Sequence, residues 1–354
     1  MKKTLSIIFS LAMILSLIPT SLAADLTGND TVKTVEEAGY SFRISEKTDE
    51  YGRITRYIKS EDYESRQTYP EFTEKMEKTK AMLAAVGMQK ENIDRLDDET
   101  LQSFAASREI TVVTSYSKVD SSGNVTYLSE KQAMAESAEL NSVQDAIRYK
   151  YAVEGAATYS TIEKKYFQDS YMRVDLTVSY QGNGQYLYAV DSKWLTMPTF
   201  RGIDSLGVCG QQNSIVTGTQ YGYCIYDITY INAGIKKYDE KVTYINNDYA
   251  NAIKGDWYGS ACHFNLPNNT YGLSASTLYS NHRVHFQYRA YRLYPESRSN
   301  FNVVGDYAHT KVSTSSSVSI GIDSSGAFSV AIGITPIKKR DIRGAEVIIH
   351  YTPD

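Results

Sequence analysis

The sequence predicts a mainly β protein of the α+β class, in which a small, mostly helical N-terminal region precedes an antiparallel, β-sandwich-like C-terminal domain. Three observations lead to this prediction. Hydrophobic residues have helical spacing over 70–107, alternate with polar residues from about residue 150, and then fall into short segments separated by Gly, Asn and Asp turns. The expected divisions are a signal peptide at 1–23, an acidic region at 24–148 and a β domain at 149–354.

The first 23 residues have the pattern of a secretory signal peptide. Two lysines precede an apolar run over 5–18, and Ser21 and Ala23 place small side chains before the expected cleavage site. We expect cleavage after Ala23 or Ala24 and a secreted, extracellular protein. The apolar run is shorter than the ~20 residues of a membrane-spanning helix, which disfavours a retained anchor.

Composition and charge exclude several classes of protein. The net charge of −4 is unlike that of a broadly basic nucleic-acid-binding protein, so no nucleic-acid partner is expected. Three cysteines are too few for a disulfide-rich scaffold. A hydrophobic content of 42% is too high for a disordered chain, so we expect a folded core.

Three short amphipathic helices are predicted between residues 70 and 107. Pro70 suits the first turn of a helix and Gly87 suits its C-terminal stop, while the third helix is expected to begin at Asp97 or Asp98. Their apolar faces need a partner surface, so we expect a small helical subdomain or a cap on the β region. The first helix has an apolar face formed by Phe72, Met76, Thr79, Leu83 and Val86.

The remainder of the N-terminal region predicts strand pairs and one longer helix. Short strands are expected on both sides of Gly52, and a hairpin is expected around the turn at 120–124. Ser129 and Gln132 have the spacing of a helix-capping box, which predicts a helix over 130–148.

From about residue 150, strand signals dominate. Apolar and polar residues alternate over 174–180, and the Gly- and Asn-containing turn at 181–184 leads into a matching strand over 186–190, which predicts a hairpin. Many such segments are typical of an antiparallel sandwich or barrel. Further strands are expected near 213–218, 220–231, 235–245, 260–265, 283–294, 301–312, 313–322, 327–335 and 345–352.

The histidines do not form a recognised metal site. His282 and His285 are three residues apart in a segment with strand character, so their side chains should point to opposite faces. The chain contains neither a C-x-x-C pair nor an HExxH motif. We therefore expect exposed strand histidines, no metal and no cofactor.

No catalytic residues are assigned. The chain lacks a GxSxG motif and a Gly-rich phosphate loop. An activated thiol is usually found at a helix N-terminus near a histidine. The residues after Cys209 have the pattern of a strand, which disfavours a cysteine hydrolase. Acidic residues of the β region would form a glycosidase site only if two of them were about 5 to 9 Å apart. A non-catalytic protein is favoured, with a hydrolase of unrecognised site as an alternative.

An extracellular protein folds in an oxidising compartment, so two of the three cysteines are expected to form a disulfide. Cys209 and Cys224 are the preferred pair, because they could face each other across one hairpin. Cys262 would then remain as a buried thiol.

Aromatic residues are concentrated over 221–271 of the predicted β domain. Tyr and Trp have a flat apolar face and a polar tip, which suits recognition of sugars or proteins. Tyr also favours strands, so a Tyr-rich core is the alternative interpretation. The residues expected to contact a ligand are Tyr221, Tyr223, Tyr226, Tyr230, Trp257 and Tyr258.

The most regular pattern is an amphipathic hairpin over 312–335. Apolar residues alternate with small polar ones on both arms, and each arm reaches the roughly 9 to 11 residues of a membrane-spanning strand. The pattern resembles the insertion hairpins of β-pore-forming toxins, and it is also the pattern of an ordinary half-buried hairpin. The residues that would insert are Val318, Ile320, Ile322, Phe328, Val330 and Ile332.

These features predict a non-catalytic, extracellular or cell-surface-associated binding protein that uses a Tyr-rich β domain. The expected partner is a polysaccharide or an extracellular protein. The first alternative is a membrane-active protein that inserts the hairpin at 312–335, and the second is a secreted hydrolase.

Overall fold

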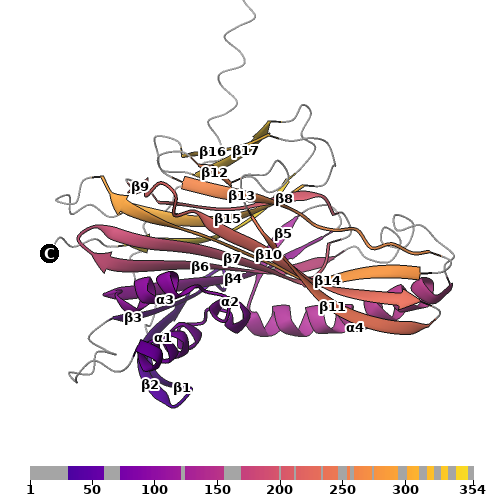
Figure 1. The fold of residues 1–354 in the computed structure, drawn as a ribbon, viewed down its shortest axis with the longest axis horizontal. Helices are drawn as coiled ribbons and strands as arrows, with labels where there is room; N and C mark the ends of the chain where they lie inside the picture. Colours follow the sequence, from indigo (N-terminus) through magenta and orange to yellow (C-terminus); the bar gives the residue numbers. More distant parts are fainter. Residues whose placement is uncertain are drawn as a thin grey trace, which may run out of the picture.

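The described part of the chain is mostly antiparallel β structure, which confirms the predicted fold class (Figure 1). Helices occur in the N-terminal part, as expected. The computed structural model describes residues 31–59, 72–120, 124–154, 169–198, 201–210, 213–232, 234–245, 253–255, 259–272, 275–293, 301–310, 317–322, 328–333 and 340–349.

An eleven-stranded sheet forms the centre of the molecule. Its main path is β1-β2-β3-β4-β6-β7-β14-β10-β11, with β5 paired to β4 and β9 paired to β14. The sheet continues across the division expected at residue 148, because β4 pairs with β6 along its whole length. Its strands are β1 (Thr31–Glu37), β2 (Tyr40–Thr48), β3 (Ile54–Lys59), β4 (Glu109–Val119), β5 (Val125–Leu128), β6 (Ser170–Gly182), β7 (Gln185–Thr196), β9 (Asn213–Ile215), β10 (Tyr221–Asn232), β11 (Ile235–Tyr244) and β14 (Ala275–Arg292).

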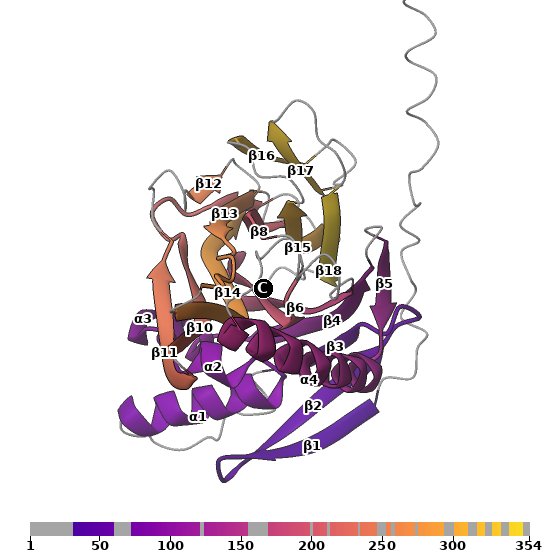
Figure 2. The same ribbon diagram turned by 90° about the vertical axis from the view of Figure 1, so that its right-hand side faces the viewer.

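A five-stranded sheet packs on one face of the large sheet, as Figure 2 shows. Leu176 and Phe286 of the large sheet share a buried core with Leu206 and Tyr307 of the smaller one, so the two sheets form a sandwich. A separate pair of strands, β16 (Ser317–Ile322) and β17 (Phe328–Gly333), lies beyond the smaller sheet. The strands of the smaller sheet are β12 (Ile253–Gly255), β13 (Gly259–Asn265), β8 (Ile203–Gly210), β15 (Phe301–Thr310) and β18 (Arg340–Ile349).

The helices lie on the other face of the large sheet (Figure 2). Leu83 and Phe104 share a buried core with Ile110 and Leu187 of the sheet, so the predicted helices are a cap on the β structure. The longest helix is attached through the Tyr171 hydroxyl, which donates to Glu136 at 2.8 Å. The helices are α1 (Phe72–Ala85), α2 (Lys90–Ile93), α3 (Asp98–Ala105) and α4 (Glu130–Glu154).

The helix ends follow the predicted signals. Gly87 has a φ of 99° just after α1, a conformation that glycine adopts without steric penalty. Asp97 caps α3 by accepting a backbone N–H at 2.7 Å. The Ser129 hydroxyl accepts the Gln132 N–H at 3.3 Å at the start of α4, which then continues beyond the expected end at residue 148.

The sequence analysis missed three strands, β1, β8 and β12, of which β8 is the most important for the fold. β8 contains Asp, Ser and Gly residues instead of a regular alternation, yet it is central to the smaller sheet. Gly207 lies so close to β13 that a Cβ there would be 2.7 Å from the Ala261 methyl group, so the tight pairing requires glycine. β14 also begins about eight residues earlier than expected, at Ala275.

Candidate functional site

Two of the predicted ligand contacts lie on the face of β10 that is turned toward the helices. Tyr223 is 1% exposed and stacks on His285 with ring centroids 5.0 Å apart. Tyr221 is half-buried beside Tyr223 and Tyr244. Burial raises the pKa of the Tyr223 hydroxyl, and the ring cannot reach a ligand at the surface, which corrects the prediction for this residue.

The next two predicted contacts lie on the opposite face of β10. Tyr226 is opposite Lys241 of β11, and Tyr230 is opposite Lys237, so each pair shares a face. Tyr279 of β14 joins them, with its ring 5.5 Å from that of Tyr226. These five residues are called the Tyr–Lys face below. Trp257 and Tyr258 lie outside the described residues.

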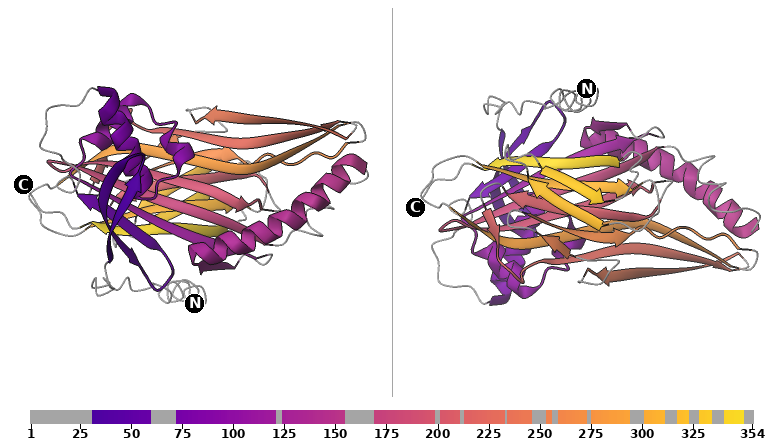
Figure 3. Two further views of the ribbon diagram at one scale, coloured as in Figure 1. Left: turned by 90° about the horizontal axis from the view of Figure 1, so that it is seen from below. Right: turned by 90° about the horizontal axis from the view of Figure 1, so that it is seen from above.

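The Tyr–Lys face is open to solvent. Tyr230 is 39% exposed, both lysines are exposed, and Tyr226 and Tyr279 are half-buried. Figure 3 shows that this end of β10, β11 and β14 extends away from the smaller sheet. Lysine and tyrosine side chains thus meet on a single, water-accessible surface.

The strand beside this surface is an edge strand. Among the described strands, β11 pairs only with β10, and its residues from 235 to 241 are all exposed. An edge strand presents backbone N–H and C=O groups that an additional strand can pair with. Arg95, at the end of α2, forms an ion pair with Glu240, which fixes β11 from the helix side.

On the helix side of the large sheet, one row of buried polar side chains crosses five neighbouring strands. The row contains residues of β4, β6, β7, β14 and β10 that lie directly opposite one another. All of them are buried beneath the helices. In order across the sheet, the members are Thr114, Asp175, Asp191, His285 and Tyr223.

Asp191 and His285 form the centre of this row. The His285 Nδ1 atom lies 2.7 Å from Asp191 Oδ1, and Asn92 of α2 donates to the same oxygen at 2.6 Å. Burial disfavours a charged His285, but Asp191 and Gln287 outweigh it and raise the pKa of the imidazole. Burial raises the pKa of Asp191 as well. The pair is enclosed on both sides, so its chemistry is that of an internal contact between sheet and helix.

The histidines are buried, which overturns the expectation that they are exposed. The described ones, His263, His282, His285 and His309, are each at most 5% exposed. His282 and His285 do point to opposite faces: the former stacks on Phe264 of the smaller sheet, and the latter faces the helices. No group of three metal-ligating side chains occurs within the described ranges.

A second polar cluster lies between the two sheets. The Trp194 indole N–H donates to the Tyr307 hydroxyl at 2.8 Å, and that hydroxyl donates to Asp204. His309 Nδ1 lies 2.9 Å from the same carboxylate. Sequence analysis missed this cluster because Asp204 belongs to the unexpected strand β8, about a hundred residues before its partners.

None of the three buried cysteines forms a disulfide, which overturns the predicted pair of Cys209 and Cys224. Cys209 lies on β8 of the smaller sheet and Cys224 on β10 of the large sheet, and not on two arms of one hairpin. Burial raises the pKa of Cys224 to about 11 and also raises that of Cys262. Thiols in this state are poor nucleophiles at neutral pH.

The C-terminal hairpin pairs as its sequence pattern predicts. Ile320 of β16 lies opposite Val330 of β17, and Val318 lies opposite Ile332. The rest of the two predicted arms lies outside the described residues, and insertion into a membrane stays a prediction. No described helix has both the length and the apolar character needed to cross a bilayer.

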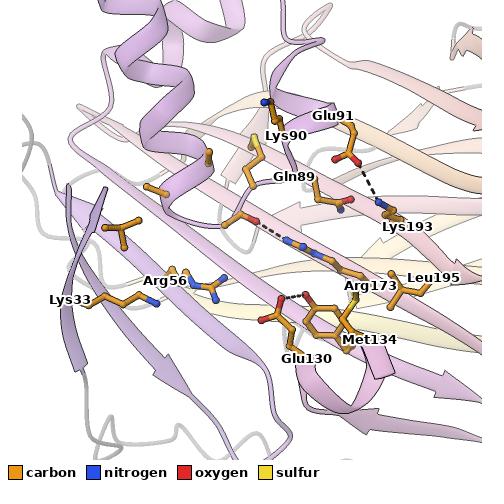
Figure 4. A pocket seen from close by; sticks show the side chains of 16 residues that line it. Lys33, Arg56, Gln89, Lys90, Glu91, Glu130, Met134, Arg173, Lys193 and Leu195 are labelled. Carbon is orange, nitrogen blue, oxygen red and sulfur yellow. Dashed lines mark hydrogen bonds and ion pairs between the residues drawn. The ribbon is translucent and has the colours of Figure 1, made fainter. Parts of the chain in front are cut away.

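A pocket of about 460 Å³ opens on the helix-covered face. It lies between β1 and β3, the connection from α1 to α2, and the start of α4, as Figure 4 shows. Arg173 crosses its floor, and its guanidinium donates to the Gly87 carbonyl at 2.6 Å. Sequence analysis did not predict this pocket, because its lining residues come from eight separate helices and strands.

Comparisons with known proteins give no family. No family model and no curated protein matches the chain. Among solved structures, the collagen-binding subdomain of the Enterococcus faecalis surface protein ACE aligns with 6% identity and a TM-score of 0.22, over 48% of this chain and 88% of that one. The collagen-binding domain of the Erysipelothrix rhusiopathiae surface protein RspB aligns with 8% identity and a TM-score of 0.23, over 50% of this chain and 62% of that one. TM-scores this low establish no shared fold, so the ligand of those two proteins is not transferred to this chain.

Proposed function

We propose that this chain is a secreted, non-catalytic binding protein that takes an extended acidic segment of an extracellular protein along β11. The observation that carries the proposal is the position of the Tyr–Lys face directly beside an edge strand of ten residues. Neither feature alone selects a partner, but together they define a backbone to pair with and a surface for its side chains.

The backbone of β11 supplies the first half of the recognition. A partner segment in extended conformation can add to an edge strand through main-chain hydrogen bonds, and its alternate side chains then lie on one face of the sheet. Side chains of the added strand would lie beside Lys237 and Lys241 on one face, and beside Tyr238 and Glu240 on the other.

The Tyr–Lys face supplies the second half. Lys237 and Lys241 share that face with Asp239 between them, so the positive charges are in excess and favour acidic residues at alternate positions of the partner. Each exposed ion pair contributes about 0.2 to 1 kcal/mol. The rings of Tyr226, Tyr230 and Tyr279 add apolar contact area at little cost in side-chain entropy.

The test is a calorimetric titration of the mature protein with a capped decapeptide of alternating Glu and Thr. We expect saturable binding that weakens about tenfold in Tyr230→Ala and up to about fivefold in Lys241→Gln, and no binding of the peptide with Lys in place of Glu. Tyr127→Ala is the matched control, because Tyr127 is 38% exposed on the distant strand β5. Lys75→Gln on α1 controls for charge.

Three outcomes would contradict the proposal. They are the absence of peptide binding at millimolar concentration, equal binding of both peptides, and equal loss of affinity in the control variants. Binding of polygalacturonate in place of the peptide would move the partner to the polysaccharides. Self-association that depends on Tyr230 would identify a second copy of the chain as the occupant.

A further inference from the structure

The pocket in Figure 4 has an excess of positive charge. Its lining contains two acidic side chains, Glu91 and Glu130, and five basic ones. Most of the basic groups already have a carboxylate partner, and two of those partners, Glu46 and Asp175, lie outside the lining. The basic residues of the lining are Lys33, Arg56, Lys90, Arg173 and Lys193.

Arg173 is held rigidly at the floor. Its Nε donates to both carboxylate oxygens of Asp175, each at 2.9 Å, and its Nη2 donates to the Gly87 carbonyl. The guanidinium also lies over the Tyr116 ring, 5.7 Å from its centroid. No described residue accepts a hydrogen bond from Nη1, so a fixed donor remains for a ligand without loss of side-chain entropy.

Two further cations border the pocket. Arg56 also lies close to Gly87, because a Cβ at Gly87 would be 2.5 Å from Arg56 Nη1. The exposed ammonium group of Lys90 has no hydrogen-bond or ion-pair partner among the described residues. A negative charge beside Gly87 would therefore meet two partly paired guanidinium groups, and Lys90 adds an unpaired positive charge to the lining.

The rest of the pocket is apolar and adaptable. Met88 lines it from the connection between α1 and α2, Met134 from α4, and Leu195 from the sheet. Methionine side chains adjust to ligands of different shape, and Met134 on α4 is 49% exposed at the rim. The volume of about 460 Å³ falls within the roughly 300 to 1,000 Å³ typical of small-molecule sites.

We propose that this pocket binds a small organic monocarboxylate, with its carboxylate at Arg173 beside Gly87 and its apolar body against Met88, Met134 and Leu195. A dianion such as phosphate fits less well, because Glu91 and Glu130 border the same space and Glu46 and Asp175 already neutralise part of the basic charge. The site is separate from the Tyr–Lys face, and either can exist without the other.

The test is a calorimetric titration of the mature protein with octanoate, and in parallel with octylammonium, octanol and inorganic phosphate. We expect one saturable octanoate site, and binding of the other three at least tenfold weaker. Lys90→Gln should weaken octanoate by up to about fivefold, because it removes an unpaired positive charge from the lining of the pocket. Met134→Glu should weaken it more than tenfold, because it adds a like charge at the apolar end.

Lys75→Gln is the matched control, since Lys75 is an exposed lysine of α1 outside the lining. It should leave the octanoate affinity within twofold of the parent. Thermal unfolding of each variant verifies the fold, which exposed positions such as Lys90 and Met134 should not disturb. Absence of saturable octanoate binding, octylammonium binding of equal strength, or unchanged affinity in both Lys90→Gln and Met134→Glu would overturn the proposal.

Discussion

β14 passes from an exposed half to a buried half, and the chemistry of its side chains changes at the same point. Over 275–281 it is mostly half-buried or exposed and carries Tyr279, whereas over 282–290 it is almost entirely buried and carries His285 and Phe286. The buried half lies between the smaller sheet and the helices. One strand therefore combines a segment of the core with a segment of the proposed binding surface, so mutations in its two halves should have different effects.

The largest expected effect is at Asp191 of β7, which lies opposite His285 of the buried half. Asp191→Ala leaves His285 and Asn92 without their shared acceptor in a fully buried site. We expect the free energy of unfolding to fall by about 3 to 5 kcal/mol, measured by denaturant titration. Asp191→Asn, which keeps the shape and one acceptor, should lose less. A loss below about 1 kcal/mol in Asp191→Ala would show that the row is not a structural contact.

The two halves of β14 can be compared directly with small truncations. Val284→Ala removes a fully buried side chain from the core between the sheets, and we expect a loss of about 2 kcal/mol in the free energy of unfolding. Thr277→Ala, on the same strand in its half-buried part, should change it by less than about 0.5 kcal/mol. Equal effects in the two variants would remove the proposed difference between the halves.

The pH dependence distinguishes the two faces of the buried half. Burial and the nearby Arg201 and Arg283 lower the pKa of His282 to about 3, against about 6.5 in an unfolded chain. Because only the unfolded state then binds the proton, the free energy of unfolding should fall by up to about 1.4 kcal/mol per unit as the pH drops from 6.5 toward 3. His285 acts in the opposite sense, since its pKa is raised and its contribution is lost as the pH rises through that value.

His282→Phe tests this assignment. Phenylalanine can keep the stacking on Phe264 and Tyr226 and cannot take up a proton. We expect stability measured between pH 6 and 4 to fall less steeply than in the parent, by about 1.4 kcal/mol per pH unit. Parallel pH curves for the two proteins would mean that His282 is not buried in its neutral form.

The smallest expected effect on stability is in the exposed half. Tyr230→Ala removes a ring that is 39% exposed on the Tyr–Lys face. The midpoint of denaturant unfolding should move by the equivalent of no more than about 0.5 kcal/mol. A larger loss would place Tyr230 among the residues that hold the sheet together.

Local sequence signals predicted much of the fold. The spacing of Met76, Thr79 and Leu83, the cap at Asp97 and the turn glycine Gly87 define the helices, and all of these act within a few residues along the chain. The alternation in β6 and β7 predicted their hairpin in the same way. Local signals failed for β8, where close packing on β13 takes precedence over strand propensity.

The candidate sites were less accessible from sequence. Strand alternation could have separated Tyr223 from Tyr226, but it does not show which face is covered. The partners of Asp191 come from α2 and β14, about a hundred residues away on either side, and the pocket combines eight helices and strands. Such contacts depend on the order of strands in the sheet, which periodicity does not determine.

The most direct test of the central claim is the calorimetric titration of the alternating Glu–Thr peptide against the parent, Tyr230→Ala and Tyr127→Ala. We expect the parent and Tyr127→Ala to bind with the same affinity, and Tyr230→Ala to bind about tenfold more weakly while unfolding at the same denaturant concentration. Equal affinity in all three proteins, or no binding in any of them, would contradict the assignment of the Tyr–Lys face and the edge of β11 as the binding surface.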